Sequence, residues 1–329
     1  MKKNIAVIAG GNSSEFPVSI RSAEQIAGEL DPDKYDVYKI IIKGTNWIIE
    51  DEKTGQIPVN KDDFSCNTPT GKLKFDCALI TIHGTPGEDG KLQGYFESLN
   101  IPYTTSGILS SSLTFNKKAT KLFLKPFGIL SPASIYLYKG ELIKTETIID
   151  KLGLPVFVKP NQSGSSFGVT KADNEATLEK AINHAFEEGD EIIIEEFIEG
   201  SEITCGLLKA GSKEIIFPLC EIVSKNEFFD YEAKYTPSKA EEIVPARISA
   251  DKTRECQSLA SYIYSAVDCK GIVRIDFILS GDKFYFLEVN TIPGMSAESI
   301  IPKMARKYGI SLKELYTLVI DDAFIRYQT

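Results

Sequence analysis

A hairpin near the C-terminus constrains this chain more than any other segment, because polar residues interrupt strands that are otherwise apolar. One strand is expected at residues 271–280 and the next at residues 284–290. Side chains alternate between the two faces of a strand, so polar residues two positions apart share a face. The polar residues with this spacing are Arg274 and Asp276 on the first strand, and Glu288 and Asn290 on the second.

The length of the turn decides whether these side chains all lie on one face, because a shift of one residue moves a strand's side chains to the other face. A loop with an odd number of residues, centred on Asp282, gives two facing pairs, namely Asp276 with Glu288 and Arg274 with Asn290. A two-residue turn at positions 281 and 282 would instead place the pairs on opposite faces. We predict the odd loop.

Two carboxylates and an amide oxygen on one face favour a bound cation, since the carboxylates otherwise repel each other. Mg²⁺ accepts such oxygen ligands together with phosphate oxygens and water. The alternative is a surface ladder of ion pairs in which Arg274 neutralises the acids. Apolar neighbours such as Ile275 and Leu287 argue against it, because they indicate a hairpin that is not freely solvated.

Three glycine-bearing segments are candidates for phosphate binding. Gly10-Gly11 follows an apolar run but lacks the third glycine of a dinucleotide-binding loop, and the segment Gly84–Lys91 lacks the spacing and the Ser or Thr of a P-loop. The segment Lys159–Gly168 lies between two expected strands, where backbone N–H groups, hydroxyls and the lysine suit a nucleotide phosphate. A flexible surface hairpin is the alternative for this third segment.

Composition favours small-molecule partners. The chain has 37 Lys and Arg against 46 Asp and Glu, a net charge of -9, which gives no reason to expect a nucleic-acid or anionic-membrane surface. The apolar run Ile5–Ala9 is too short for the core of a signal peptide, and no run approaches the length of a membrane span. The six cysteines form no C-x-x-C pair, which is typical of reduced thiols in the cytoplasm.

Hydrophobic periodicity predicts an open, Rossmann-like α/β sheet first, and smaller α+β units after a boundary near residue 110, where a Lys-rich helix at Thr114–Phe127 leads into prolines. The first unit is expected to contain strands at Asn4–Ala9, Tyr35–Ile42 and Asp76–His83, and helices at Pro17–Leu30 and Leu92–Leu99. The later strands are expected at Val156–Lys159, Glu191–Ile198, Glu202–Leu208 and Ile215–Val223. The later helices are expected at Asn174–Glu188, Asp251–Val267, Ser296–Tyr308 and Leu312–Tyr327.

Several motifs in this order resemble those of the ATP-grasp ligases, and within them the D-alanine–D-alanine ligases, over nearly the whole chain. They include Gly10-Gly11-x-Ser13-x-Glu15, His83-Gly84-x-x-Gly87-Glu88-Asp89-Gly90, Lys159-Pro160 with Gly164-Ser165-Ser166-x-Gly168, Glu195 with Gly200-x-Glu202, Lys234-Tyr235, Arg274-x-Asp276, and Glu288-x-Asn290-Thr291-x-Pro293-Gly294. The sequence departs from the family at Asn116, where an acid is frequent, and at Thr85-Pro86.

The resemblance implies a three-domain fold of α/β and α+β units, with a Rossmann-like domain at 1–110 and two ATP-grasp subdomains at 111–198 and 199–329. A loop at about 224–242 would close over the site. It also implies a cytoplasmic, ATP-dependent enzyme that joins two D-alanines through D-alanyl phosphate for peptidoglycan synthesis. Two Mg²⁺ or Mn²⁺ ions and a homodimer belong to the same expectation, with no nucleic-acid or membrane partner; a monovalent cation is left open.

The resemblance further implies a role for individual residues. The nucleotide would contact Lys117, Lys159, Ser165, Ser166, Lys234, Glu195, the backbone near Phe197 and Ile198, and Glu202 at the ribose. The first D-alanine would lie beside Glu15 and His83, with Ser165 and Tyr235 hydrogen-bonded to Glu15, and the second beside Ser299 and Ile300. Arg274 and the N–H of Gly294 would form the oxyanion hole, and the metals would bind Asp276, Glu288 and Asn290, with Glu288 shared.

Simpler alternatives stay open for single residues. Glu15 could be a carboxylate that favours a helix start, His83 a turn residue, Tyr235 an exposed loop aromatic and Ser299 an ordinary helical hydroxyl. Alternatives also stay open for the function: a relative that accepts D-lactate or D-serine, a dinucleotide oxidoreductase, or a regulatory nucleotide-binding protein. The resemblance associates loss of the tyrosine with depsipeptide formation, so Tyr235 after Lys234 favours the dipeptide ligase. The missing third glycine disfavours the oxidoreductase, and the intact polar hairpin disfavours a protein without turnover.

Overall fold

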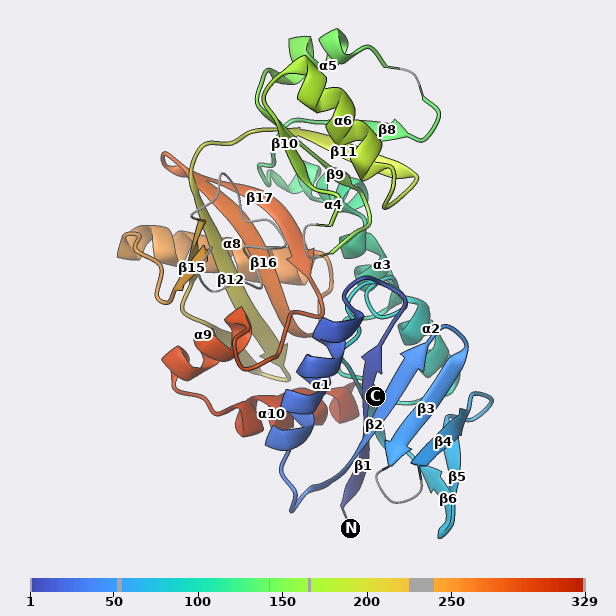
Figure 1. Cartoon of the computed structure of the whole chain (residues 1–329). Helices are drawn as coiled ribbons and strands as arrows, with labels where there is room; N and C mark the ends of the chain where they lie inside the picture. The colour runs from blue at the N-terminus through green and yellow to red at the C-terminus, as the bar shows by residue number, and fades with distance from the viewer. Residues whose placement is uncertain (1, 52–54, 142, 165–166, 225–239, 328–329) are drawn as a thin grey trace.

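The computed structural model describes residues 2–51, 55–141, 143–164, 167–224 and 240–327 (Figure 1). Within these ranges the strands form three sheets, of seven, four and six strands. Each sheet has helices packed against it, which gives the mixed α/β and α+β architecture that was predicted. None of the helices in these ranges is both long and apolar enough to cross a membrane.

The N-terminal sheet has a parallel part and an antiparallel extension, in the order β6-β5-β4-β3-β2-β1-β7. Its elements are β1 (Lys3–Gly10), α1 (Phe16–Glu29), β2 (Tyr35–Lys43), β3 (Asn46–Asp51), β4 (Gly55–Asn60), β5 (Ser65–Thr68), β6 (Gly71–Lys74), β7 (Cys77–Ile80) and α2 (Lys91–Ser98). β1 pairs in parallel with both β2 and β7, as expected for an α/β unit. Strands β3 to β6 were not predicted, because they are short and rich in polar residues.

The predicted helix at Thr114–Phe127 is wrong as a single element. The chain forms α3 (Ile108–Phe115), α4 (Lys117–Leu124) and a short 3-10 helix, η1 (Lys125–Phe127). Asn116 separates the two helices, since its backbone is extended and its side-chain oxygen accepts a 2.8 Å hydrogen bond from the N–H of Ala119. Asparagine is a favoured N-cap residue, so Asn116 begins the helix that carries Lys117.

A separate antiparallel sheet forms the middle of the chain, in the order β10-β9-β11-β8. Its elements are β8 (Ser134–Tyr138), α5 (Thr145–Leu152), β9 (Val156–Pro160), β10 (Thr170–Ala172), α6 (Glu175–Ala185) and β11 (Glu191–Glu196). Side chains from α5 and α6, such as Ile148 and Leu178, pack with Val158 and Ile192 of the sheet in a core of their own. Helices α5 and α6 lie together at the outer end of the molecule (Figure 1).

The third sheet carries the polar hairpin, in the order β15-β14-β12-β16-β17, with β13 paired to β12. Its elements are β12 (Ser201–Ala210), β13 (Lys213–Ile216), β14 (Cys220–Ser224), β15 (Ala240–Ile243), α8 (Ala250–Ala266), β16 (Gly271–Ser280), β17 (Lys283–Asn290), α9 (Ile300–Tyr308) and α10 (Leu312–Arg326). The predicted strand Ile215–Val223 is wrong as one strand, because it divides around Pro218, which has no N–H for a sheet.

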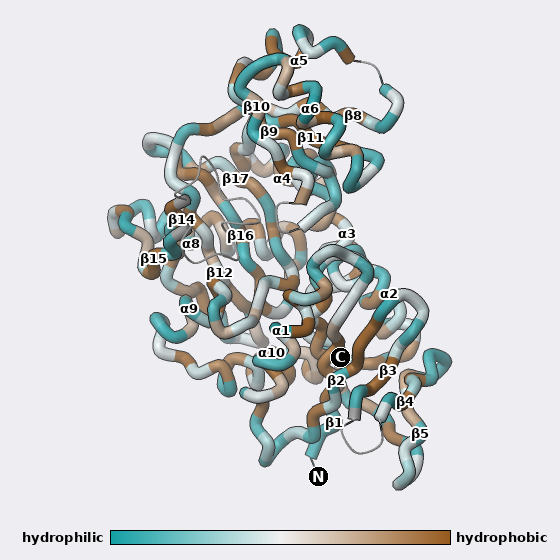
Figure 2. The backbone as a smooth tube through the Cα atoms, in the orientation of Figure 1, coloured by the Kyte–Doolittle hydropathy of each residue, from teal (hydrophilic) through white to brown (hydrophobic). Residues whose placement is uncertain are grey.

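The first and third sheets share a hydrophobic core. Val7 of β1 and Ile26 of α1 belong to the same buried cluster as Leu208 of β12 and Tyr316 of α10. Helices α1 and α10 lie between these two sheets (Figure 1). Figure 2 shows hydrophobic stretches along the strands of the N-terminal sheet and hydrophilic stretches in many outer turns. The third sheet is therefore held firmly to the first, while the middle sheet has its own core.

Candidate functional site

The polar hairpin places its four side chains on one face, but not by the turn that was predicted. Asp276 pairs with Glu288 and Arg274 with Asn290, as expected. The turn itself has two residues, since Ser280 pairs with Lys283, so the predicted odd loop is wrong.

A β-bulge restores the shared face. Phe277 pairs with Phe286, whereas Asp276 pairs with Glu288, so Leu287 is an extra residue on β17. A bulge of this kind shifts the register by one residue and is frequent beside active sites. The bulge could not be predicted from Leu287, because a leucine also suits a regular strand.

The carboxylate of Asp276 accepts hydrogen bonds from three side chains. Its Oδ2 accepts hydrogen bonds from Arg274, at 2.8 Å, and from the Asn290 amide, at 3.0 Å. Its Oδ1 accepts a 2.7 Å hydrogen bond from the hydroxyl of Thr204. Thr204 lies directly opposite Asp276 on β12, and Glu202 precedes it by two positions on the same face. Thr204 had no predicted role, although its spacing from Glu202 was a usable signal.

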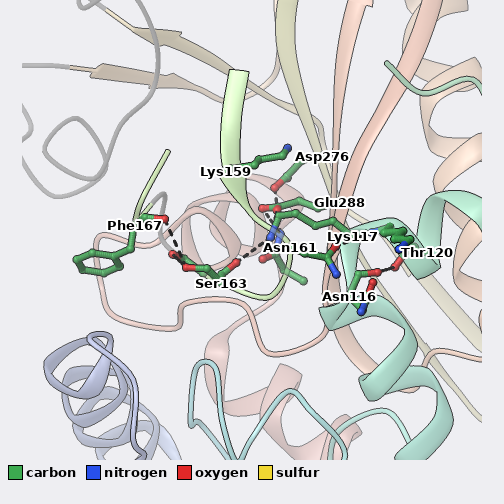
Figure 3. A network of polar contacts seen from close by, with 12 residues as sticks. Asn116, Lys117, Thr120, Lys159, Asn161, Ser163, Phe167, Asp276 and Glu288 are labelled. Atoms are coloured by element: carbon green, nitrogen blue, oxygen red, sulfur yellow. Dashed lines mark hydrogen bonds and ion pairs between the residues drawn. The ribbon is translucent and has the colours of Figure 1, made fainter. Parts of the chain in front are cut away.

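Lys117 connects the hairpin with the glycine-serine segment. Its ammonium group donates to the carbonyl of Ser163 at 2.7 Å and lies 3.4 Å from Oε2 of Glu288. The side chain of Asn161 accepts from the N–H of Lys118 at 2.8 Å, which ties the same segment to the start of α4. Figure 3 shows Lys117, Asn161 and Glu288 gathered where α4, the segment after β9 and β17 meet.

Glu195 of β11 lies within reach of two lysines. Nζ of Lys159, on the neighbouring strand β9, lies 2.6 Å from Oε2 of Glu195. Nζ of Lys121, on α4, forms an ion pair with Oε1. Burial lowers the pKa of Lys121, and the charges of Lys159 and Lys117 lower it further. Lys121 had no predicted role, although it lies four positions after Lys117 and so on the same helix face.

Two further predicted residues directly follow β11. Phe197 lies beside Phe157, with 6.0 Å between the ring centroids, and the ammonium group of Lys171 lies 4.8 Å from the Phe197 ring centroid. The N–H of Phe197 donates to the carbonyl of Pro155 at 3.2 Å. Ile198 is partly buried in the same connection. This connection joins the middle sheet to the third sheet.

Glu15 lies buried at the start of α1, but its side chain does not cap that helix. A Cβ atom built on Gly164 would be only 2.2 Å from Oε2 of Glu15, so the glycine-serine segment approaches this carboxylate closely. Gly164 therefore brings residues distant in the sequence into one site.

His83 and Glu88 are buried near Glu15. Burial lowers the pKa of His83, which keeps the imidazole neutral, and its Nε2 has no hydrogen-bond partner among the described residues. Burial, and then the charge of Glu15, raise the pKa of Glu88 to about 8. The carboxyl of Glu88 accepts a 2.8 Å hydrogen bond from the N–H of Gly84. Glu88 was part of a predicted motif but received no role.

The buried Glu88 carboxyl predicts a pH dependence of stability. Its pKa is about 8 in the folded chain against 4.5 ordinarily, so between these values the folded state holds a proton that the unfolded chain has lost. The free energy of unfolding therefore falls as pH rises through this window. Glu88→Gln should flatten that fall, measured by urea unfolding between about pH 4 and about pH 9, a range that spans both pKa values. An equally steep fall in the variant would contradict this assignment.

Ser299 and Gly294 are neighbours at the start of α9. The hydroxyl of Ser299 hydrogen-bonds that of Ser296 at 2.7 Å, and a Cβ on Gly294 would lie 2.9 Å from Oγ of Ser299. Ser299 occupies the N-cap position without capping the helix by its side chain, and Ile300 is the first helical residue. The N–H of Met295 donates to Ser22 of α1 at 3.2 Å, which ties this segment to the N-terminal unit.

Four predicted site residues lie outside the described residues: Ser165, Ser166, Lys234 and Tyr235. Their assigned roles stay predictions. Most of the loop at about 224–242 also lies outside the described residues, so its closing over the site stays a prediction too.

The donor set of the hairpin suits a divalent cation. Among the described residues, no group of three or more His, Cys, Asp or Glu side chains forms a metal centre alone. Asp276, Glu288 and Asn290 instead offer two carboxylates and an amide on one face. Mg²⁺ is commonly held by one or two carboxylates together with substrate phosphates, so these residues fit it, or the similar Mn²⁺.

The site lies between two antiparallel sheets, with Lys159 and Glu195 on one and Asp276 and Glu288 on the other. Together with the N-terminal α/β sheet, this architecture defines an ATP-grasp ligase. A family profile described as D-ala D-ala ligase N-terminus matches residues 4–106, and one described as D-ala D-ala ligase C-terminus matches residues 119–321. The chain belongs to the D-alanine–D-alanine ligase family.

Individual relatives agree with this assignment. The chain is 50% identical over 321 residues to a D-alanine–D-alanine ligase of Azobacteroides pseudotrichonymphae, which covers 97% of this chain and 99% of the relative. It is similar to the D-Ala:D-Ser ligase VanG from Enterococcus faecalis, with a TM-score of 0.86, 33% identity, and 98% and 100% of the two chains covered. A D-alanine–D-alanine ligase from Bacillus anthracis complexed with ATP gives a TM-score of 0.79 at 31% identity, with 99% of each chain covered.

Proposed function

We propose that this protein uses ATP to join two D-alanine molecules into D-alanyl-D-alanine, through a D-alanyl phosphate intermediate. The observation that carries the proposal is the single polar face on β16 and β17, which Lys117 connects to the glycine-serine segment. In an enzyme of this family the product supplies peptidoglycan precursors, in the cytoplasm. The ATP complex of the Bacillus anthracis ligase supports ATP as the nucleotide.

The nucleotide would lie between the middle and third sheets. Lys117 and Lys159 would bind its phosphates, together with Ser165, Ser166 and Lys234. Glu195 and the backbone of Phe197 and Ile198 would face the adenine, and Glu202 the ribose. Lys117 supports this role because its ammonium group already lies between Ser163 and Glu288, where phosphate oxygens would have to pass.

Asp276, Glu288 and Asn290 would hold two Mg²⁺ or Mn²⁺ ions, with Glu288 shared between them. When bound, these cations neutralise negative charge on the ATP phosphates. Asn290 and Arg274 hold Asp276 in place from two directions, and Thr204 from a third. These three side chains thus fix the position of the Asp276 carboxylate before ATP binds.

The first D-alanine would place its ammonium group at Glu15, with Ser165 and Tyr235 holding that carboxylate and the neutral His83 beside it. A carboxylate oxygen of this D-alanine attacks the γ-phosphorus of ATP, ADP leaves, and D-alanyl phosphate forms. Burial of Glu15 strengthens its attraction for an ammonium group, because little water competes there.

The second D-alanine would bind its carboxylate at Ser299 and Ile300, where the N-terminus of α9 favours an anion. Its neutral amine attacks the acyl carbon, and the resulting oxyanion is stabilised by Arg274 and the N–H of Gly294. The acyl carbon–oxygen bond to phosphate then breaks, phosphate leaves, and the nitrogen loses a proton. The loop at about 224–242 would exclude water, which protects the acyl phosphate from hydrolysis.

A ligase that accepts D-serine is the second candidate, because one similar structure is a D-Ala:D-Ser ligase. The relative with 50% identity is a D-alanine–D-alanine ligase, which favours D-alanine. The test is to incubate the protein with ATP, Mg²⁺, D-alanine and an equal amount of D-serine or D-lactate, and to identify products by mass spectrometry. D-alanyl-D-alanine should dominate; its absence would reject the proposal.

Gly164→Ala tests the close approach of the glycine-serine segment to Glu15. The new methyl group would lie 2.2 Å from the Glu15 carboxylate and so displace it. We expect KM for the first D-alanine to rise by about tenfold or more, whereas KM for ATP changes little. Initial rates over a D-alanine series and an ATP series give both constants. Gly28→Ala in α1 is the matched control, because nothing lies within 4 Å of the added Cβ, and it should leave both constants unchanged.

Assembly and domain limits belong to the same proposal. The family suggests a homodimer with domains at 1–110, 111–198 and 199–329. Analytical ultracentrifugation of the full chain tests the dimer, and a monomer at micromolar concentration would contradict it.

A further inference from the structure

Helix α4 carries a deeply buried lysine that the proposed mechanism does not use. The side chain of Lys121 is only 3% exposed. It follows Lys117 by four positions, so both lysines project from the same face of the helix. Burying an ammonium group costs free energy unless the group is paired. The partner of Lys121 therefore indicates what this lysine does.

That partner is Glu195, whose side chain is 4% exposed. Its two carboxylate oxygens are held by different lysines. Lys121 contacts Oε1 from α4, and Lys159 lies 2.6 Å from Oε2 on the neighbouring strand. One buried carboxylate is therefore shared by a lysine with a proposed role at the ATP phosphates and by a lysine without one.

The two lysines cannot be equivalent once ATP binds. Under the proposed function, the ammonium group of Lys159 binds the ATP phosphates. It then contacts Glu195 less closely than it does without ATP. Lys121 comes from a different element, which is fixed at its start by the Asn116 cap. It can therefore stay with Glu195 while Lys159 turns to the phosphates.

We propose that Lys121 is a positioning residue of the nucleotide site, which holds the Glu195 carboxylate toward the adenine while Lys159 binds the phosphates of ATP. The inference rests on the proposed roles of Glu195 and Lys159. A carboxylate held in this way accepts a hydrogen bond from the adenine amino group. Guanine carries a carbonyl oxygen at that position, so the same carboxylate would repel it. Lys121 thereby contributes to the selection of adenine.

The experiment measures binding of the non-hydrolysable analogue AMP-PNP with Mg²⁺ by isothermal titration calorimetry, without D-alanine. Lys121→Met keeps the length of the side chain and removes its charge, and it should raise Kd by about tenfold or more. Lys121→Arg restores the charge and should recover most of the affinity. Lys125→Met, on an exposed lysine just after the same helix, is the matched control and should bind like the unmodified protein.

A double-mutant cycle separates positioning from a general structural role. In a Glu195→Gln background, the further change Lys121→Met should alter Kd by no more than about twofold, because the carboxylate that Lys121 holds is absent. This comparison also serves if Lys121→Met alone does not fold. The preference for AMP-PNP over GMP-PNP should fall in both single variants.

Unchanged affinity and base preference in folded Lys121→Met would overturn the inference. So would an equal loss of affinity in the Glu195→Gln background. Because binding is measured without D-alanine, these results are independent of whether the protein makes D-alanyl-D-alanine. A protein that makes no dipeptide would refute the proposed function while the nucleotide measurements still decide the role of Lys121.

Discussion

Replacing Glu288 with glutamine is expected to lower kcat by about three orders of magnitude, while the fold is retained. The side chain is 26% exposed and lies 3.4 Å from the ammonium group of Lys117, which also donates to the carbonyl of Ser163 at 2.7 Å and so keeps a partner when the Glu288 charge is removed. Catalysis suffers because Glu288 is the proposed ligand common to both cations. Steady-state rates of phosphate release at increasing Mg²⁺ measure the effect.

Glu187→Gln is a suitable control for Glu288→Gln, because it removes the same charge from an exposed position outside the site. It should leave kcat unchanged. If Glu288→Gln reaches the kcat of the unmodified protein at saturating Mg²⁺, the carboxylate is not a shared metal ligand, and the proposed arrangement of the site would have to be revised.

Replacing Arg274 with lysine is expected to lower kcat by about two to three orders of magnitude, with a smaller change in KM. Arg274 donates to both oxygens of Asp276 through its Nε and NH2 groups. A lysine keeps the positive charge but not this planar, two-point geometry. The charge would no longer be directed at the oxyanion that forms on the acyl carbon. Pre-steady-state rates of dipeptide formation measure the loss.

Arg274→Gln serves as the comparison, because it removes the charge and leaves Asp276 buried without its cation. It should reduce the free energy of unfolding by about 3 kcal/mol or more, whereas Arg274→Lys should reduce it far less. Urea unfolding of both variants separates the loss of stability from the loss of catalysis. A fully active Arg274→Lys variant would show that the arginine is structural and would remove it from the oxyanion hole.

Much of the fold was predictable because long apolar strands and amphipathic helices give strong periodic signals. Both ends of β1, α1 and β2 lie within one residue of the expected positions. Short elements were not predictable. Apolar and polar residues alternate only weakly along strands β3 to β6. The break at Asn116 depends on its N-cap role, and the lysines that follow it are also typical of a continuous helix.

The hairpin shows where a correct conclusion rested on a wrong step. The pairing of Asp276 with Glu288 was expected from an odd loop, but it results from a two-residue turn combined with a bulge at Leu287. Turn length and bulge position compensate each other, and a single sequence determines only their combined effect. A functional requirement for one shared face was the better guide.

Residues buried between distant segments were the hardest to predict. Thr204 and Lys121 contact partners more than 70 positions away, Asp276 and Glu195 respectively. Their own sequence surroundings are those of an ordinary strand and an ordinary helix. Glu88 lies in a recognisable motif, yet only its burial beside Glu15 explains the raised pKa.

The proposed transfer of phosphate to the D-alanine carboxylate is tested most directly with D-alanine labelled with ¹⁸O in its carboxyl group. The labelled substrate is incubated with ATP and Mg²⁺, and the released phosphate is analysed by mass spectrometry. Attack of a carboxylate oxygen on the γ-phosphorus requires that each released phosphate carry one labelled oxygen. Dipeptide formed with unlabelled phosphate would contradict an acyl-phosphate intermediate.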